Sequence, residues 1–235
     1  MKEILIVCSQ HGDELLGEQL YDYMAINHKY LLNYVDFTLA NPAAHELGKR
    51  YLDTDMNRSY YRGDAGYEAK QAKHLLEKID DGDYRLVLDM HTTTAEQAPC
   101  FITARMTPVI TGFIAATAID NIVLMEHEIV KHSLIGVCDK AVSIEVARHD
   151  VNDQVLEELA GSILFNIAGV HLERSRRVFP VADLLTQVLA DQSASLANFE
   201  LSDKGYYPVL IGEKAYDTST GYIGFMALTS EEITL

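Results

Sequence analysis

Residues 1–14 read MKEILIVCSQHGDE, a short apolar run that passes directly into polar and acidic side chains. Ile, Leu and Val dominate the run, which is typical of a buried strand. The apolar part is too short for the core of a secretory signal, and charged residues follow it at once. We therefore expect a first strand in a cytoplasmic protein, with His11 and Glu14 placed just beyond the end of that strand.

The apolar pattern of the first residues is repeated along the chain. Comparable runs, each a predicted strand, occur at residues 4–7, 35–39, 86–88, 101–103, 122–125 and 141–146. Apolar side chains at helical spacing lie between several of them, at residues 14–23, 67–79 and 151–167. Short buried strands that alternate with amphipathic helices are typical of an α/β fold. We predict a mixed, mostly parallel central sheet flanked by helices.

The sequence changes its character in its last quarter. A charged, mostly basic stretch comes first, at residues 173–177, and residues 178–197 have room for a short helix. Two strand-like runs follow at residues 206–211 and 222–228, with Gly and Asp in the turns around them. The sequence thus predicts a main α/β domain over residues 1–172 and a small β-rich C-terminal domain over residues 173–235.

Composition restricts the class of partner. The 235 residues include 35 acidic and 19 basic side chains, which gives a formal net charge of −16. Such a surface repels nucleic acids and anionic membranes, and an anionic substrate would need local arginine or lysine. Cys8, Cys100 and Cys138 are too few and too far apart for a disulfide framework or a Cys-x-x-Cys metal site. We therefore expect neither nucleic acid nor a membrane as a partner.

Two histidines lie at the ends of predicted strands. His11 ends the first strand and Glu14 comes three residues later, while His91 follows the run at residues 86–90. Histidine nitrogen and carboxylate oxygen are the usual ligands of a catalytic zinc ion, which keeps one position open. In a parallel pair of strands, His11, Glu14 and His91 would meet at one edge of the sheet. Asp89 shares a face with His91 and is placed to accept the second ring N–H.

Each of these motifs is a weak sign when taken alone. A single histidine after a strand is more often solvated or hydrogen-bonded than bound to a metal, and His-x-x-Glu occurs widely by chance. Two such motifs at the ends of two neighbouring strands favour the metal site over the solvated alternative.

Further blocks of sequence accompany the histidines in a fixed order. They are HGDE at 11–14, NPAA at 41–44 followed by RYLDTDMNR at 50–58, LDMHTTT at 88–94, IEV at 144–146, and more weakly YPV at 207–209 with EKAY at 213–216. In their order and rough spacing these blocks resemble the aspartoacylase and succinylglutamate desuccinylase family, a branch of the zinc carboxypeptidase fold. The likeness is closer to the aspartoacylase branch.

The resemblance implies a zinc-dependent hydrolase of amide bonds that deacylates a small, acidic N-acyl amino acid. It assigns one Zn²⁺ per chain to His11, Glu14 and His91. It assigns the role of general base and acid to Glu145, and the polarisation of the substrate carbonyl to Arg50. Glu145 ends an apolar strand, where burial raises the pKa of a carboxyl group toward a useful value. On the residues alone, a glutamate stabilised by a helix N-terminus stays the alternative.

Substrate binding falls, by the same resemblance, on three further positions. Asn57 and Arg58 would grip a substrate carboxylate, and Tyr216 would help to close the site. Arginine suits this role because its planar fork matches a carboxylate and stays charged. The alternatives are a solvated surface arginine and, since the chain has 13 tyrosines, a tyrosine that only packs.

The sequence also departs from the family. Members that act on acetylaspartate carry another arginine near the position of Ile135, for which Lys131 or His132 are the nearest substitutes. After the Glu-Val pair the family often has Gly-Pro-Gln, whereas residues 147–149 are Ala-Arg-His. Arg148 either supplies the missing substrate-binding cation or is an exposed residue at the start of a helix. These departures leave the metal chemistry intact and the identity of the substrate open.

Two other functions are consistent with the sequence. One is a zinc carboxypeptidase that acts on a peptide or a cell-wall fragment; a C-terminal domain that caps the cleft would argue against it, since a capped cleft admits only small acyl amino acids. The other is a non-catalytic binding protein on the same fold, although every catalytic residue type is present. A small N-acyl amino acid is therefore the expected substrate. The resemblance also implies that two copies of the chain form a homodimer.

Overall fold

The strands of the chain form one mixed sheet. The computed structural model describes residues 2–61, 63, 65–216 and 221–235. The strands within them are β1 (Ile4–Cys8), β2 (Val35–Leu39), β3 (Leu86–Thr93), β4 (Cys100–Thr103), β5 (Asn121–Met125), β6 (Ala141–Ala147), β7 (Ser175–Leu185), β8 (Tyr207–Val209), β9 (Gly224–Ala227) and β10 (Glu231–Thr234). Their order across the sheet is β2-β1-β3-β6-β4-β5-β7-β9-β8, and β10 pairs with β7.

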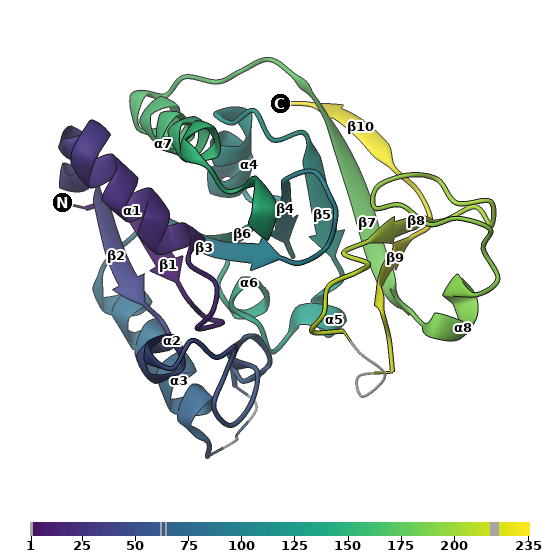
Figure 1. The fold of residues 1–235 in the computed structure, drawn as a ribbon. Coiled ribbons are helices and arrows are strands. Elements are labelled where there is room, and N and C mark those ends of the chain that lie inside the picture. Colours follow the sequence, from purple (N-terminus) through teal and green to yellow (C-terminus); the bar gives the residue numbers. More distant parts are fainter. Residues whose placement is uncertain (1, 62, 64, 217–220) are drawn as a thin grey trace.

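Helices cover both faces of this sheet (Figure 1). They are α1 (Leu16–Asn27), α2 (Pro42–Glu46), α3 (Tyr67–Asp81), α4 (Pro108–Ala115), α5 (His127–Val130), α6 (Leu134–Val137), α7 (Asp153–Ala168) and α8 (Gln187–Ala190). Alternate residues of β1 belong to two hydrophobic clusters: Ile6 packs with α1, α4 and α7, and Val7 packs with α3 and α6. Each fully buried side chain of this kind contributes about 1.5–3 kcal/mol to folding.

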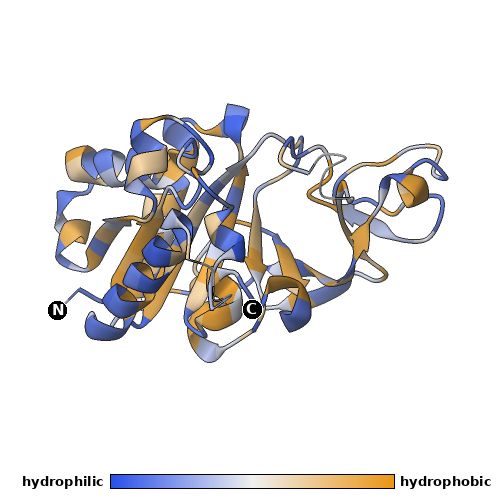
Figure 2. Cartoon of the chain, turned by 90° about the horizontal axis from the view of Figure 1, so that it is seen from below, coloured by the Kyte–Doolittle hydropathy of each residue, from blue (hydrophilic) through white to orange (hydrophobic). Residues whose placement is uncertain are grey.

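The predicted fold class is confirmed. β2, β1, β3 and β6 run parallel to one another, and so do β4, β5 and β7. The two groups meet at β4 and β6, which are antiparallel. Figure 2 shows hydrophobic strands between helices whose outward faces are hydrophilic. None of the described helices is both long and apolar enough to cross a membrane.

The structure differs from the sequence analysis at residues 173–197. The long strand β7 occupies much of this stretch, and the expected helix is reduced to the single turn α8. The side chain of Arg176 in β7 is fully buried and donates to the carbonyl oxygens of Ile114 and Thr117 at 3.4 and 2.8 Å. A buried arginine breaks the apolar alternation that identifies a strand, and so the charged stretch did not indicate one.

The C-terminal residues contribute β-structure, as predicted. β7 lies parallel to β5, and the β8–β9 pair extends the sheet beyond β7. Phe179 of β7 and Phe225 of β9 belong to the same core cluster as Val7. The described strands of residues 173–235 thus continue the sheet of residues 1–172, and a domain boundary at residue 172 stays a prediction.

Candidate metal centre and substrate cleft

Three adjacent parallel strands, β1, β3 and β6, bring the polar side chains to one edge of the sheet. Val7 of β1 pairs with Asp89 of β3, and His91 of β3 pairs with Glu145 of β6. His11 follows β1 at the same edge. Because parallel strands keep their carboxyl ends together, the two histidines and Glu145 open into one cleft.

The rings of His11 and His91 face the two oxygens of one carboxylate. The Nδ1 atom of His11 lies 2.7 Å from Oε1 of Glu14, and the Nδ1 atom of His91 lies 2.8 Å from Oε2. All three side chains are buried, and one ligand atom from each lies within 4.8 Å of the others. Two imidazole nitrogens and a carboxylate are the donor set of a catalytic zinc site, so these residues would hold a zinc ion.

The second ring nitrogen, Nε2, of each histidine lies close to an aspartate carboxylate. Nε2 of His91 lies 2.9 Å from Oδ2 of Asp89, and Nε2 of His11 lies 3.1 Å from Oδ1 of Asp55. With Nε2 as the protonated nitrogen, each ring presents the lone pair of Nδ1 to a metal ion. The structure places Asp89 as the sequence predicts. Asp55 was missed: it lies inside the block at 50–58, but nothing in the sequence marks it as a partner of His11.

Asp89 is itself fixed by hydrogen bonds. Its Oδ1 accepts from Nε2 of Gln10 at 2.6 Å, and its Oδ2 accepts from the hydroxyl of Ser143 at 2.8 Å. The hydroxyl of Tyr60 donates in turn to Gln10 at 2.5 Å. Burial acts to raise the pKa of Asp89, but His91 and these donors outweigh burial and lower the pKa below its usual range. The carboxylate therefore stays charged and orients the His91 ring.

The turn between β1 and α1 brings Glu14 back toward His11. The amide of Glu14 donates to the carbonyl oxygen of His11 at 3.0 Å. The sequence suggested that Glu14 lies in the first turn of the helix. Because α1 begins only at Leu16, Glu14 lies instead in the turn before it. A Cβ atom at Gly12 would lie 2.3 Å from a backbone carbon of Ala44, so the close approach of α2 requires glycine here.

Arg50 and Arg58 both face the carboxylate of Asp55 at the site. Nη1 of Arg50 lies 3.2 Å from Oε1 of Glu14, and its Nη2 lies 3.5 Å from Oδ2 of Asp55. Nε of Arg58 lies 3.6 Å from the same Oδ2, and its Nη2 donates to the hydroxyl of Tyr222 at 2.6 Å. Burial acts to raise the pKa of Asp55, but the neighbouring histidine and arginines hold it well below its usual range. A permanent negative charge therefore keeps both guanidinium groups at the cleft.

Glu145 lines the same cleft as the three metal-ligand candidates. Burial raises the pKa of its carboxyl group to about 8, against the effect of His91 and with a further contribution from Glu14. A carboxyl group with a pKa in this range can both take up and return a proton near neutral pH.

The C-terminal segment, residues 210–216, borders the cleft, whose cavity volume is about 110 Å³. Oε2 of Glu213 accepts from the hydroxyl of Thr93 and from the amide of Thr94, both at 2.7 Å. These bonds tie the C-terminal segment to the end of β3, next to His91. Glu213 belongs to the weakest of the sequence blocks, and no role was predicted for it.

Tyr216 also lines the cleft, at the end of the C-terminal segment. Its ring packs against Tyr222 and Phe225, with ring centroids 5.0 and 5.6 Å apart. Burial raises the pKa of its hydroxyl well above the usual value, so the group stays a neutral hydrogen-bond donor. Its position fits the predicted role in closing the site.

The remaining predicted residues divide into two groups. Asn57 lines the cleft, and its Oδ1 accepts from the amide of Leu134 at 3.2 Å, which leaves its NH₂ to donate. Arg148 lies outside the cleft lining and pairs with Asp13 at 3.1 Å, so its predicted role in substrate binding has no support. The nearest substitutes for the missing arginine are also engaged elsewhere, Lys131 with Glu128 at 2.8 Å and His132 with the carbonyl oxygen of Tyr60 at 2.9 Å.

Two curated relatives that match part of this chain are named as probable aspartoacylases. The chain is similar to a "Probable aspartoacylase" of Prochlorococcus marinus subsp. pastoris, with 31% identity over 109 residues that cover 43% of this chain and 37% of the relative. It is similar to another from Parasynechococcus marenigrum, with 33% identity over 112 residues and the same two shares. The matches therefore span well under half the length of these relatives.

Solved structures share the fold at low sequence identity. Murine aminoacylase 3 is 19% identical with a TM-score of 0.69, and covers 100% of this chain and 96% of its own. The succinylglutamate desuccinylase from Chromobacterium violaceum is 16% identical with a TM-score of 0.73, and covers 100% and 85%. A metallo-carboxypeptidase from Burkholderia cenocepacia is 15% identical with a TM-score of 0.54, and covers 71% and 56%. The fold is thus carboxypeptidase-like.

The N-terminal two thirds of the chain also match a family profile. The profile of the succinylglutamate desuccinylase/aspartoacylase catalytic domain covers residues 1–156, which include β1, β3, β6 and the side chains that line the metal centre. The chain therefore belongs to the succinylglutamate desuccinylase/aspartoacylase family.

Proposed function

We propose that this chain is a zinc-dependent amidohydrolase that removes the acyl group from a small N-acyl amino acid. The observation that carries the proposal is the arrangement of His11, Glu14 and His91 beside Glu145, a buried carboxyl group with a raised pKa. Two imidazoles and one carboxylate suit a catalytic zinc ion, and the raised pKa suits a general base.

The residues of the cleft divide the chemistry among them. His11, Glu14 and His91 would hold the zinc ion, which would act as a Lewis acid toward the substrate carbonyl. Glu145 takes a proton from the attacking water and passes it to the leaving amine. Arg50 stabilises the negative charge that develops on the carbonyl oxygen, a contribution of about 2.7–4 kcal/mol for a well-placed donor. The amide C–N bond breaks, and the products are a carboxylic acid and an amino acid.

Two further side chains would hold the amino-acid part of the substrate. Arg58 offers its guanidinium group to the carboxylate, and Asn57 offers its side-chain NH₂. The cavity volume of about 110 Å³ and the C-terminal segment at its border support a small substrate over the peptide chain of a carboxypeptidase.

The proposal is tested by a single substitution with two measurements. We expect Glu145→Gln to bind zinc as the wild type does, because Glu145 is outside the ligand set. We expect turnover to fall by about 10²–10⁴-fold, the usual contribution of a general base. Zinc is measured by atomic absorption, and turnover by release of the free amine from a panel of formyl, acetyl and succinyl amino acids.

The ligand set is checked in the same assay. His91→Ala should lose zinc as well as activity, whereas Glu145→Gln should lose activity alone. A wild-type protein that binds zinc but releases no amine from any acyl amino acid would instead favour the non-catalytic binding protein.

A further inference from the structure

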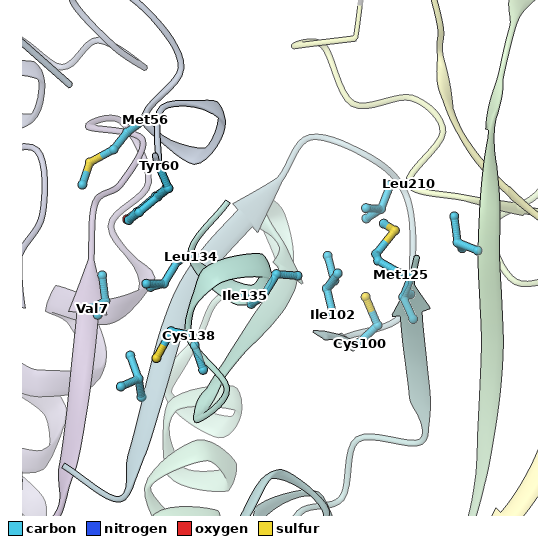
Figure 3. Packing of buried hydrophobic residues seen from close by; sticks show 14 of the residues in the cluster. Val7, Met56, Tyr60, Cys100, Ile102, Met125, Leu134, Ile135, Cys138 and Leu210 are labelled. Carbon is cyan, nitrogen blue, oxygen red and sulfur yellow. The ribbon is translucent and has the colours of Figure 1, made fainter. Parts of the chain in front are cut away.

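The part of the cleft beyond Glu145 is apolar. Ile102 of β4, Met125 of β5, Ile135 of α6 and Leu210 of the C-terminal segment all line it. Figure 3 shows these four side chains together near the ends of β4 and β5, with Ile135 reaching in from α6 and Leu210 from the C-terminal segment. We call these four residues the apolar wall. The sheet order places β4 and β5 on the far side of β6 from the metal-ligand candidates of β1 and β3.

Fixed positive charge in the cleft is limited to two side chains. Among the described residues that line it, Arg50 and Arg58 are the cations other than the histidines, and both already face Asp55. The lining also carries four carboxylates, those of Glu14, Asp55, Glu145 and Glu213. A divalent ion and two guanidinium groups would together only balance these four carboxylates. Among the described lining residues, no cation beyond Arg50 and Arg58 could therefore pair with a second substrate carboxylate.

Neighbouring cations are held away from the apolar wall. Both Nη atoms of Arg105 donate to the carbonyl oxygen of Gly136 at 3.2 Å, and Nη1 also pairs with Asp139 at 3.1 Å. Lys131 and Arg148 pair with the carboxylates of Glu128 and Asp13, as described above. A carboxylate placed against the apolar wall would therefore be buried without a partner, which is strongly unfavourable.

Resting on the function proposed above, we propose that the amino-acid side chain of the substrate is neutral and apolar. The cleft accepts one carboxylate at Arg58 and Asn57, and the apolar wall receives an aliphatic side chain of the size of leucine or methionine. The preferred substrates are thus N-acyl derivatives of neutral aliphatic amino acids. The acidic amino acid expected from the sequence is replaced in this proposal, because the described residues that line the cleft include no cation for its second carboxylate.

The zinc-loaded full chain is assayed by amine release from acetylleucine, acetylmethionine, acetylaspartate, acetylglutamate and succinylglutamate. We expect kcat/KM to be at least about 100-fold higher for the two apolar substrates, since an unpaired buried carboxylate is discriminated against strongly. Equal or better turnover of the acidic substrates would overturn this inference and leave the proposed function standing. If the zinc-loaded protein turned over neither the apolar nor the acidic substrates, the proposed function itself would be overturned.

Binding gives a second readout that does not depend on turnover. Zinc-loaded Glu145→Gln should bind acetylleucine more tightly than acetylaspartate by calorimetry, by at least about tenfold. Tighter binding of acetylaspartate would contradict the inference even if the protein proved to have no activity.

Ile135 supplies the matched pair of variants. Ile135→Arg adds a cation to the apolar wall and should shift the ratio of kcat/KM toward acetylaspartate by at least about tenfold, whereas Ile135→Leu should keep the wild-type ratio. If the arginine variant does not fold, Ile135→Thr should lower kcat/KM for acetylleucine more than for acetylaspartate. An unchanged ratio in the folded variant would show that the apolar wall does not contact the substrate.

Discussion

At Glu145 the fold keeps a carboxyl group where its charge is disfavoured. Burial raises its pKa from 4.5 to about 8, so the folded protein retains a proton that the unfolded chain has released between these values. Proton binding by the folded state alone means that stability falls as pH rises through this window, by up to ~1.4 kcal/mol per pH unit. The catalytic role proposed for Glu145 and the stability of the fold at neutral pH are thus opposed.

Replacing this group should remove that pH dependence. For protein stripped of zinc by a chelator, we expect Glu145→Gln to gain free energy of unfolding relative to the wild type as the pH is raised from 5 to 8. Urea denaturation at the two pH values measures the difference. The comparison with the wild type cancels the opposite contributions of Asp55 and Asp89, whose lowered pKa values stabilise the fold above the usual carboxyl range. A difference that is the same at both pH values would contradict the raised pKa.

At the scale of the element, β3 connects the metal centre to the C-terminal segment. His91 lies in β3, and Thr93 at its end and Thr94 just after it donate to Glu213. Hydrogen bonds to a charged acceptor contribute about 1.5–3 kcal/mol each when their loss leaves buried groups unpaired.

Glu213→Ala should therefore release the C-terminal segment from β3. We expect faster hydrogen exchange at the amides of Thr94 and of residues 211–216, and an increase in KM larger than the decrease in kcat, because Tyr216 loses its fixed position. Glu200→Ala, which removes an exposed carboxylate of the same region, is the matched control and should change neither. Equal effects of the two substitutions would show that Glu213 does not hold the segment.

Elements differ in how well the sequence predicts them. The helices α1, α3 and α7 and the strands from β1 to β6 follow from apolar periodicity, with shifts of a few residues at their ends. β7 does not, because its buried Arg176 finds backbone partners in another element. The gathering of His11, Glu14 and His91 follows from motifs at strand ends, whereas the link between Asp55 and His11 depends on how a loop folds over the sheet edge.

At the scale of the whole molecule, residues 173–235 complete the sheet. β7 pairs with five residues of β5, and Phe179 and Phe225 belong to the core cluster that includes Val7. Without them β5 would present an unpaired edge and an exposed apolar surface.

A fragment of residues 1–172 should therefore fail to fold by itself. We expect it to aggregate in size-exclusion chromatography and to show no cooperative thermal transition, in contrast to the full chain. A soluble fragment with a sharp transition would instead establish the domain boundary at residue 172.

The bonds between Thr93 and Glu213 span 120 positions of the chain. During translation, the strand that carries His91 leaves the ribosome well before the residue that fixes the cleft over it. The residues of β1 and β3 are therefore available for pairing early, whereas the border of the cleft is completed only after residue 213 has been made. A chain that ends between these two residues would lack the carboxylate that fixes the C-terminal segment to β3, whatever else it had formed by then.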